Sequence, residues 1–160
     1  MTTAPKLDAN FIKTFAAAAL ETLRVQCSFE ARVGKPFIKG QGEEVESAIA
    51  GIIGLTSNVF KGTIAIAFPE KTFLAIMGGM LGESFEVMTP DLEDGAAELM
   101  NIVFGCAKKS LSEKGFTVER AVPTVVKGKN VEIRHISTAP ILIIPFESPA
   151  GGLQIEIVLE

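Results

Sequence analysis

The sequence predicts an α+β fold of two layers, in which an antiparallel-rich sheet carries long helices on one face. Three observations lead to this prediction. Apolar residues recur at helical spacing over residues 10–27 and 89–111. Residues 60–68 and 153–159 instead alternate their apolar side chains, as strands do. The turn-forming segment Ser-Pro-Ala-Gly-Gly at 148–152 indicates that the strands on either side of it are antiparallel neighbours.

The composition is that of one globular domain. The chain has 160 residues, of which 48% are hydrophobic and 21% charged, so it can bury a sizeable core. The net charge is −4 and no basic cluster exceeds a lysine pair, which argues against nucleic acid or an anionic membrane as the partner. No apolar run is long enough to span a bilayer, and the N-terminus lacks the features of a signal peptide. Because the two cysteines, Cys27 and Cys106, lie on predicted helices, we expect reduced, packed thiols and a cytoplasmic protein.

The other elements follow from the same two periodicities. Asp8 or Asn10 can cap the first helix, which runs to about Cys27. A second helix over residues 70–81 is expected to end at Gly82. The segments predicted as strands are 29–38 (interrupted in its middle), 46–55, 60–68, 116–126, 131–137, 141–146 and 153–159.

The last predicted strand has a distinct pattern. Its large aliphatic residues alternate with Gln154, Glu156 and Val158. This alternation is typical of a strand with one wetter face. We therefore expect residues 153–159 to be a possible sheet edge that is open to pairing.

The two halves of the chain resemble each other, which suggests a tandem duplication within a single domain at 1–160. Each half, at about 8–68 and about 89–160, has a long helix, a strand that begins with phenylalanine and a hairpin. The helix at about 70–81 would be a connection that the second half lacks.

The segment 89–111 holds the candidate site. Thr89 can cap this helix, Pro90 can occupy its first position, and acidic residues fill its first turn. A core-facing stripe is formed by Ala96, Met100, Val103, Ala107 and Leu111. A second, largely polar stripe is formed by Asp94, Glu98, Asn101, Gly105 and Lys108.

Glu98 and Asn101 are the candidate catalytic residues. Residues three apart stand on one helix face, roughly 5–6 Å apart at Cβ, so both can touch one partner. A glutamate offers an anionic acceptor to a partner cation, and an asparagine amide can orient a water molecule without titrating. Gly105 leaves the next turn bare for a partner's backbone, and Asp94 and Lys108 are further candidates for partner docking. The alternative interpretation is a solvated helix face without a role.

The pattern Asp94-x3-Glu98-x2-Asn101 resembles the Asp/Ser-x3-Glu-x2-Asn signature of the CheC/CheX/FliY phosphatases of bacterial chemotaxis. Proteins of that family are built from a duplicated helix-and-sheet unit. CheC-like members typically carry the signature in both halves, whereas CheX-like members carry it once, in the later helix. The first helix of this chain has no glutamate and asparagine at that spacing, so the chain is similar to the CheX-like members.

The resemblance implies removal of the phosphoryl group from the aspartyl phosphate of the response regulator CheY. It implies that Glu98 pairs with the regulator's active-site lysine and that Asn101 holds a water in line with phosphorus. The phosphorylated aspartate and Mg²⁺ would belong to the regulator, so no cofactor or metal of the chain's own is expected. The family further implies a homodimer that joins sheets across subunits.

A non-catalytic binding module of the same fold, such as a flagellar-switch or regulator-docking protein, is the competing interpretation. The presence of both Glu98 and Asn101 on one stripe favours the enzyme. His135 is the only histidine and falls in a predicted strand, so a histidine-based triad or metal site has little support and a structural role is expected.

Overall fold

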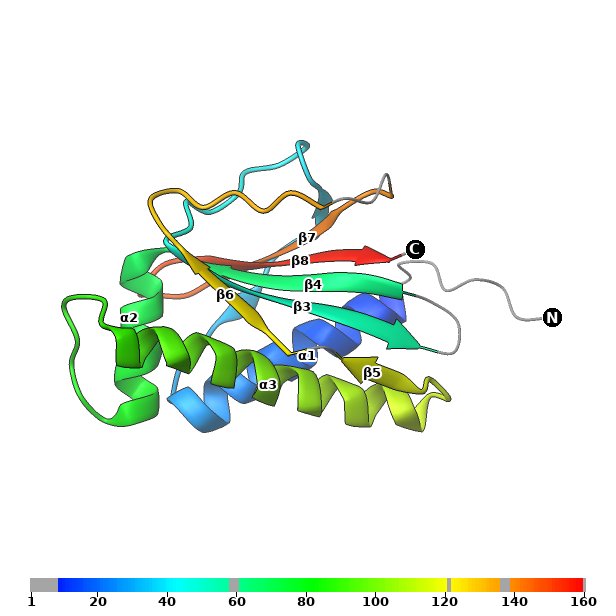
Figure 1. Ribbon diagram of the computed structural model, residues 1–160, viewed down its shortest axis with the longest axis horizontal. Helices are drawn as coiled ribbons and strands as arrows, with labels where there is room; N and C mark the ends of the chain where they lie inside the picture. Colours follow the sequence, from blue (N-terminus) through cyan, green and yellow to red (C-terminus); the bar gives the residue numbers. More distant parts are fainter. Residues whose placement is uncertain (1–8, 58–60, 121, 136–138, 160) are drawn as a thin grey trace.

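The computed structural model describes residues 9–57, 61–120, 122–135 and 139–159. These residues form one antiparallel sheet with three helices, and the predicted α+β class is confirmed (Figure 1). The elements in chain order are α1 (Ala9–Cys27), β1 (Arg32–Val33), β2 (Phe37–Ile38), β3 (Ile49–Ser57), β4 (Lys61–Phe68), α2 (Glu70–Leu81), α3 (Pro90–Glu113), β5 (Val118–Arg120), β6 (Thr124–Lys127), β7 (Leu142–Glu147) and β8 (Leu153–Leu159).

Two adjacent hairpins form the centre of the sheet. β3 pairs with β4, β7 pairs with β8, and the pairing of β4 with β8 joins the two hairpins. At one edge β1 and β2 pair with β7, and at the other edge β5 and β6 pair with β3. The strands after α1 therefore complete the second hairpin, and the strands after α3 complete the first. From either edge of the sheet, two short strands are followed by a hairpin. The tandem duplication with halves at 8–68 and 89–160 stays a prediction.

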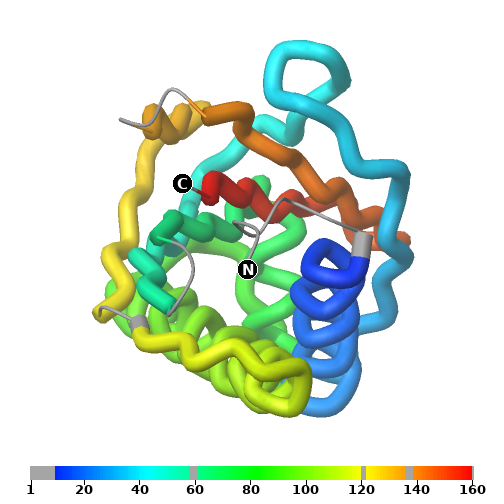
Figure 2. Tube along the Cα trace, turned by 90° about the vertical axis from the view of Figure 1, so that its right-hand side faces the viewer, coloured from blue at the N-terminus to red at the C-terminus, as the bar shows by residue number. Residues whose placement is uncertain are grey.

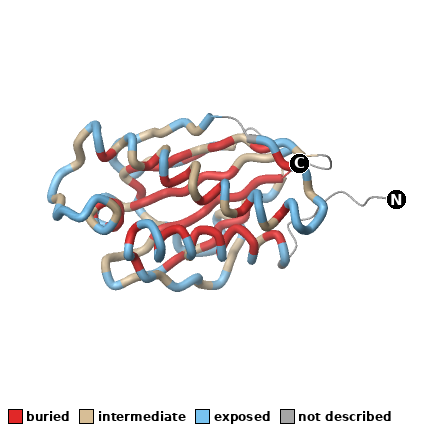
Figure 3. Tube along the Cα trace, turned by 90° about the horizontal axis from the view of Figure 1, so that it is seen from below, coloured by how far each residue is buried: buried red, intermediate tan, exposed pale blue. Residues whose placement is uncertain are grey.

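The helices cover one face of the sheet (Figure 2), and Figure 3 shows buried residues in both the helices and the strands. The core between these layers is rich in phenylalanine. The rings of Phe15 in α1 and Phe104 in α3 lie 6.5 Å apart, and those of Phe68 in β4 and Phe73 in α2 lie 5.4 Å apart. Each ring buried in this way stabilises the fold by about 3 kcal/mol. The first pair joins α1 to α3 and the second joins α2 to the sheet, while Met100 of α3 packs on Gly51 of β3.

The opposite face of the sheet is also covered, so the predicted wetter face of the last strand is wrong. All residues of β8 are buried, including Gln154 and Glu156. Residues 128–135 pass over this face, where Ile133 packs in a small apolar cluster with alanines of β3 and β4 such as Ala50. The prediction of an open edge is wrong too, because β8 lies between β4 and β7.

Two further strand predictions need correction. The predicted strand 116–126 is two short strands, β5 and β6. Residues 131–135 contain no strand, and the rest of that predicted strand, 136–138, lies outside the described residues. The reason is a turn at the end of β6, where Asn130 has a φ of 48° and the N–H of Val131 donates to the carbonyl oxygen of Ser47 at 2.6 Å. This turn sends the chain across the sheet instead of along it.

The helix ends agree with the sequence in most places. Gly82 ends α2 in the left-handed conformation at a φ of 73°. Asn10 lies inside α1 and does not cap it, and Asp8 lies outside the described residues. Gly79 meets the end of α1, since a Cβ there would lie 1.7 Å from the carbonyl oxygen of Cys27. Gly79 therefore allows α2 to pack closely against α1.

Candidate functional site

α3 carries every residue of the predicted site. The side chain of Thr89 accepts a hydrogen bond from the N–H of Leu92 at 3.4 Å, and Pro90 follows at the first helical position, as predicted. At the other end, Lys114 caps the helix and Gly115 has a φ of 90°. The predicted core stripe is confirmed, since Ala96, Met100, Val103, Ala107 and Leu111 are all buried. The helix face opposite this stripe is thereby turned outward.

The α3 polar face, by which we mean Asp94, Glu98, Asn101, Gly105 and Lys108, lies outside the core. Asn101 is half-buried and the other four residues are exposed. Among the residues that the structure describes, the carboxylates of Asp94 and Glu98 and the ammonium of Lys108 have no ion-pair partner. The structure thus gathers all five predicted residues on one helix face, with charges available to another molecule.

The two glycines within α3 have different surroundings. A Cβ on Gly95 would lie 2.5 Å from the sulfur of Met77 in α2, so glycine is needed there for helix packing. A Cβ on Gly105 would meet nothing within 4 Å. Glycine in a helix interior costs roughly 0.5–1 kcal/mol relative to alanine. Nothing that the structure describes around position 105 therefore requires a glycine there.

β6 lies beside α3. At the end of β6, Lys127 forms an ion pair with Glu93 in the first turn of α3. Further along, Met100 packs on Gly51 of β3, which pairs with Val125 of β6. The sequence does not predict that β6 lies beside α3, because the pairing of β6 with β3 joins residues far apart in the chain and no local pattern encodes it. The strand predicted at 116–126 is the part of the sequence analysis that contains β6.

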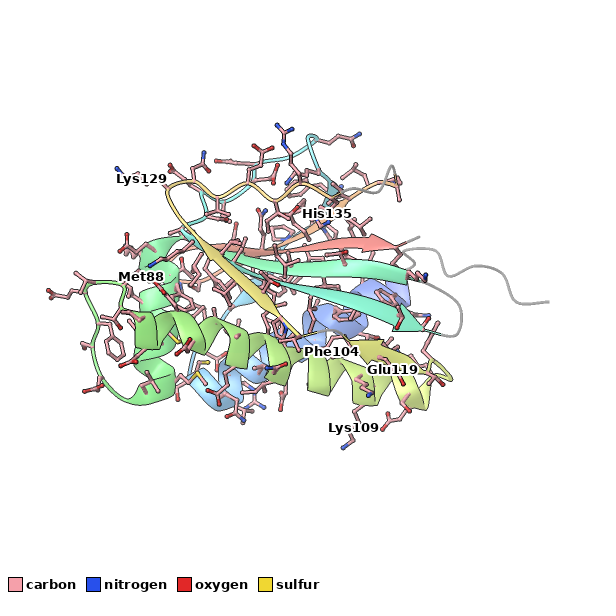
Figure 4. The ribbon with its side chains drawn as sticks, in the orientation of Figure 1. Met88, Phe104, Lys109, Glu119, Lys129 and His135 are labelled. Carbon is pink, nitrogen blue, oxygen red and sulfur yellow. The ribbon has the colours of Figure 1, made fainter. Side chains whose placement is uncertain are left out.

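A partly buried polar cluster lies on the far side of the sheet from α3 (Figure 4). The ammonium of Lys39 lies 3.0 Å from a carboxylate oxygen of Glu156 and 3.1 Å from one of Glu44, and Nε2 of His135 lies 3.4 Å from the same Glu156 oxygen. Burial alone would raise the pKa of the Glu156 carboxyl, but His135 and Lys39 beside it outweigh burial and hold that pKa below its ordinary value. This environment supports the structural role expected for His135.

In the described part of the chain, no group of three or more histidine, cysteine, aspartate or glutamate side chains could hold a metal ion. Within the same ranges, no helix has the length and apolar character needed to cross a membrane.

Comparison with known protein families matches residues 49–147, more than half of the chain, to the chemotaxis phosphatase CheX. The chain belongs to the CheX family. The CheY-P phosphatase CheX of Thermotoga maritima is 27% identical over 129 residues, which cover 80% of this chain and 82% of that protein. The resemblance first suggested by Asp94, Glu98 and Asn101 is confirmed at the level of the family.

Solved CheX structures have the same fold. The chemotaxis protein CheX from Vibrio vulnificus matches with a TM-score of 0.88 and 37% identity, over 95% of this chain and all of that one. A chain of the CheX–CheY–BeF₃–Mg²⁺ complex from Borrelia burgdorferi matches with a TM-score of 0.79 over 97% of this chain and 99% of that one. At 23% identity, this second likeness establishes a shared fold only.

Proposed function

We propose that this chain hydrolyses the aspartyl phosphate of a CheY-like response regulator. Membership of the CheX family and the name of the Thermotoga relative, a CheY-P phosphatase, support this reaction. The observation that carries the proposal is the placement of Glu98 and Asn101 one helical turn apart on the exposed side of α3. An exposed helix face suits an enzyme that completes another protein's active site.

Glu98 is the docking residue of this proposal. Its carboxylate is exposed and has no ion-pair partner within the described ranges, so it can receive a cation from the regulator without first breaking a contact. The regulator's active-site lysine is the cation that we assign to it. A charge-assisted pair of this kind contributes roughly twice as much as a neutral hydrogen bond and fixes the register of the two proteins.

Asn101 is the catalytic residue of this proposal. Its amide, about 4.5 Å further along the helix axis than Glu98, enters the regulator's active site and holds a water molecule in line with phosphorus. The water oxygen bonds to phosphorus, the bond from phosphorus to the aspartyl oxygen breaks, and inorganic phosphate and a free carboxylate result. Phosphoryl transfer is catalysed mainly by positioning and charge stabilisation, so a neutral amide is sufficient.

The other parts of the mechanism come from the partner or from the rim of the site. The phosphorylated aspartate and the Mg²⁺ that neutralises the phosphoryl oxygens belong to the regulator. Asp94 and Lys108 contact the regulator on either side of Glu98 and Asn101, and Gly105 lets its backbone approach α3. The homodimer also remains a proposal, and with β8 at the centre of the sheet it would use an outer strand instead.

An acyl-phosphate assay tests the proposal. A phosphorylated CheY-like receiver is followed in Mg²⁺ with and without a catalytic amount of this chain, and we expect accelerated loss of the acyl phosphate. Gln26→Ala, at an exposed amide near the end of α1, serves as a control for Asn101→Ala. If none of several candidate receivers loses phosphate faster, the binding-module interpretation replaces the enzyme.

A further inference from the structure

We infer that a cavity on the sheet face away from α3, the far-face cavity, binds a small organic cation that carries N–H donors, of the alkylamine or guanidine class. The cavity measures about 360 Å³ and is lined by residue 39, residues 44–47, residues 130–133 and two residues of β8, Gln154 and Glu156. This volume lies within the range of small-molecule sites. The residues proposed for phosphatase activity all lie on α3, so the inference goes beyond that function and does not depend on it.

Hydrogen bonds within the chain hold the walls of the far-face cavity in place. The side-chain oxygen of Gln154 accepts a hydrogen bond from the N–H of Val45 at 2.9 Å, and its Nε2 donates to the carboxylate of Glu44 at 3.3 Å. On the opposite wall, the N–H of Val131 donates to the carbonyl oxygen of Ser47 at 2.6 Å. The segments around the cavity are therefore joined to one another and to β8. A ligand would enter a site that is already formed.

Two buried polar side chains of the lining, those of Glu156 and Ser47, have oxygens without a partner. The Glu156 side chain is 3% exposed, and both Lys39 and His135 approach its Oε1. Within the described ranges, Oε2 of Glu156 accepts no hydrogen bond, and the hydroxyl of Ser47, a residue that is 3% exposed, makes none either. Nε2 of His135 is the only side-chain polar atom of the described residues that is both sealed from solvent and without a hydrogen-bond partner, so these two oxygens are open to the cavity. Buried polar groups are normally hydrogen-bonded, and here the missing partner is a donor that enters the cavity.

The charges around the far-face cavity select a cation as that donor. Its lining holds four carboxylates and one ammonium group, those of Glu44, Glu46, Glu132, Glu156 and Lys39. Lys39 is already shared between Glu44 and Glu156, and in the described part of the chain Glu46 and Glu132 form no ion pair. An excess of negative charge therefore remains, which attracts cations and strengthens their N–H hydrogen bonds to carboxylate oxygens. A metal ion does not fit, because no group of three or more suitable side chains among the described residues could hold one.

Calorimetric and NMR titrations of the full chain test the inference, with pentane-1,5-diamine and agmatine as the two probes. They are run at about 0.15 M salt, which screens attraction to charges on the open surface. We expect saturable binding with a dissociation constant of roughly a millimolar or less, and amide shifts confined to residues 44–47, 130–133 and the adjoining part of β8. Pentamethonium has the carbon chain and charge of the diamine but no N–H donors, and it should bind at least about tenfold more weakly.

Two substitutions in the cavity are compared with two on the surface. Ser47→Ala removes a hydroxyl that has no partner within the described residues, so it should leave the fold intact and raise the dissociation constant about threefold to tenfold. Glu156→Gln keeps the shape of the side chain and removes its charge, and it should raise the constant about tenfold or more. Ser112→Ala and Glu113→Gln, at exposed positions of α3, are the matched controls and should change nothing. Urea denaturation checks that Glu156→Gln is folded, and the result for Ser47→Ala does not depend on that variant.

Three results would overturn the inference. The first is a wild-type chain that binds neither the diamine nor agmatine saturably, and the second is equal affinity for the diamine and pentamethonium, which would reduce the effect to charge attraction. The third is tighter binding of a short peptide with one lysine and blocked ends, which would assign the cavity to a side chain of a partner protein instead of a free amine. No receiver is present in these titrations, so they are decided separately from the proposed phosphatase activity.

Discussion

Replacing Gly105 by alanine tests separately whether glycine is needed there for stability of the fold and for docking of the partner. The new Cβ would meet no atom within 4 Å, so the substitution introduces no clash. Alanine is favoured over glycine in a helix interior by roughly 0.5–1 kcal/mol. For a chain of this length, a gain near 1 kcal/mol raises the unfolding temperature by about 2–4 °C. Gly105→Ala should therefore be more stable than the wild type.

The same substitution should impair the reaction. Its methyl group projects from the turn after Asn101, where the proposal brings a partner's backbone close to α3. A displacement of the docked receiver by about 1 Å can cost roughly a hundredfold in rate, so we expect kcat/KM to fall by between tenfold and a hundredfold. Thermal denaturation and acyl-phosphate loss are measured on one preparation.

Gly95→Ala is the internal control for this experiment. Its Cβ would lie 2.5 Å from the sulfur of the buried Met77, and overpacking of this kind costs about 1–3 kcal/mol. This variant should therefore unfold at a lower temperature than the wild type. A Gly105→Ala protein with raised stability and unchanged kcat/KM would show that the bare turn has no role in docking. Lowered stability would contradict the open surroundings described for Gly105.

Three further predictions concern stability and reactivity. Burial raises the pKa of the Cys27 thiol to about 11. Iodoacetamide at about pH 8 should therefore alkylate the half-buried Cys106 at least about tenfold faster than it alkylates Cys27. Mass spectrometry of the native and the denatured protein measures both rates. The pKa of Glu156 is lowered in the folded state, so its carboxylate stabilises the fold above the ordinary pKa of glutamate, and this contribution is lost as the pH falls through the lowered value. Urea denaturation should accordingly show that Glu156→Gln is less stable than the wild type at neutral pH and loses less stability in acid. If the free energy of unfolding of the two proteins fell in parallel as the pH was lowered, the stabilising role of the Glu156 carboxylate would be contradicted. Gly79→Ala places a Cβ 1.7 Å from a backbone oxygen and should lower the free energy of unfolding by about 3 kcal/mol or more, whereas a wild-type denaturation curve would disprove the close contact with α1.

The parts of the fold that follow local rules could be predicted from the sequence. The cap at Thr89, the stop at Gly82 and the buried stripe of α3 depend on neighbours within a few residues, and all three are as predicted. The hairpins were predicted for the same reason, since each is specified by its own turn and alternation. The prediction that the candidate-site residues lie on one face of α3 depended on helical periodicity alone.

The parts that depend on long-range pairing could not be predicted. The alternation of Gln154 and Glu156 in β8 was interpreted as exposure, but both side chains are covered by segments that are distant in sequence. Glu156 is paired with Lys39, a contact that spans 117 residues. The crossing of residues 128–135 over the sheet depends on the left-handed conformation of Asn130. No local sequence pattern predicts that the polar side chains of a strand will be buried against a loop.

The rate of phosphoryl loss at saturation in Asn101→Ala tests the central claim most directly. Single-turnover loss of acyl phosphate is measured with the chain in excess over a phosphorylated receiver, and affinity is measured separately on receiver loaded with BeF₃ and Mg²⁺. If Asn101 positions the attacking water and Glu98 fixes the docking, Asn101→Ala should lose about a hundredfold or more in rate with affinity nearly unchanged, while Glu98→Ala also binds more weakly. An Asn101→Ala chain that retains the wild-type rate at saturation would contradict the proposed mechanism.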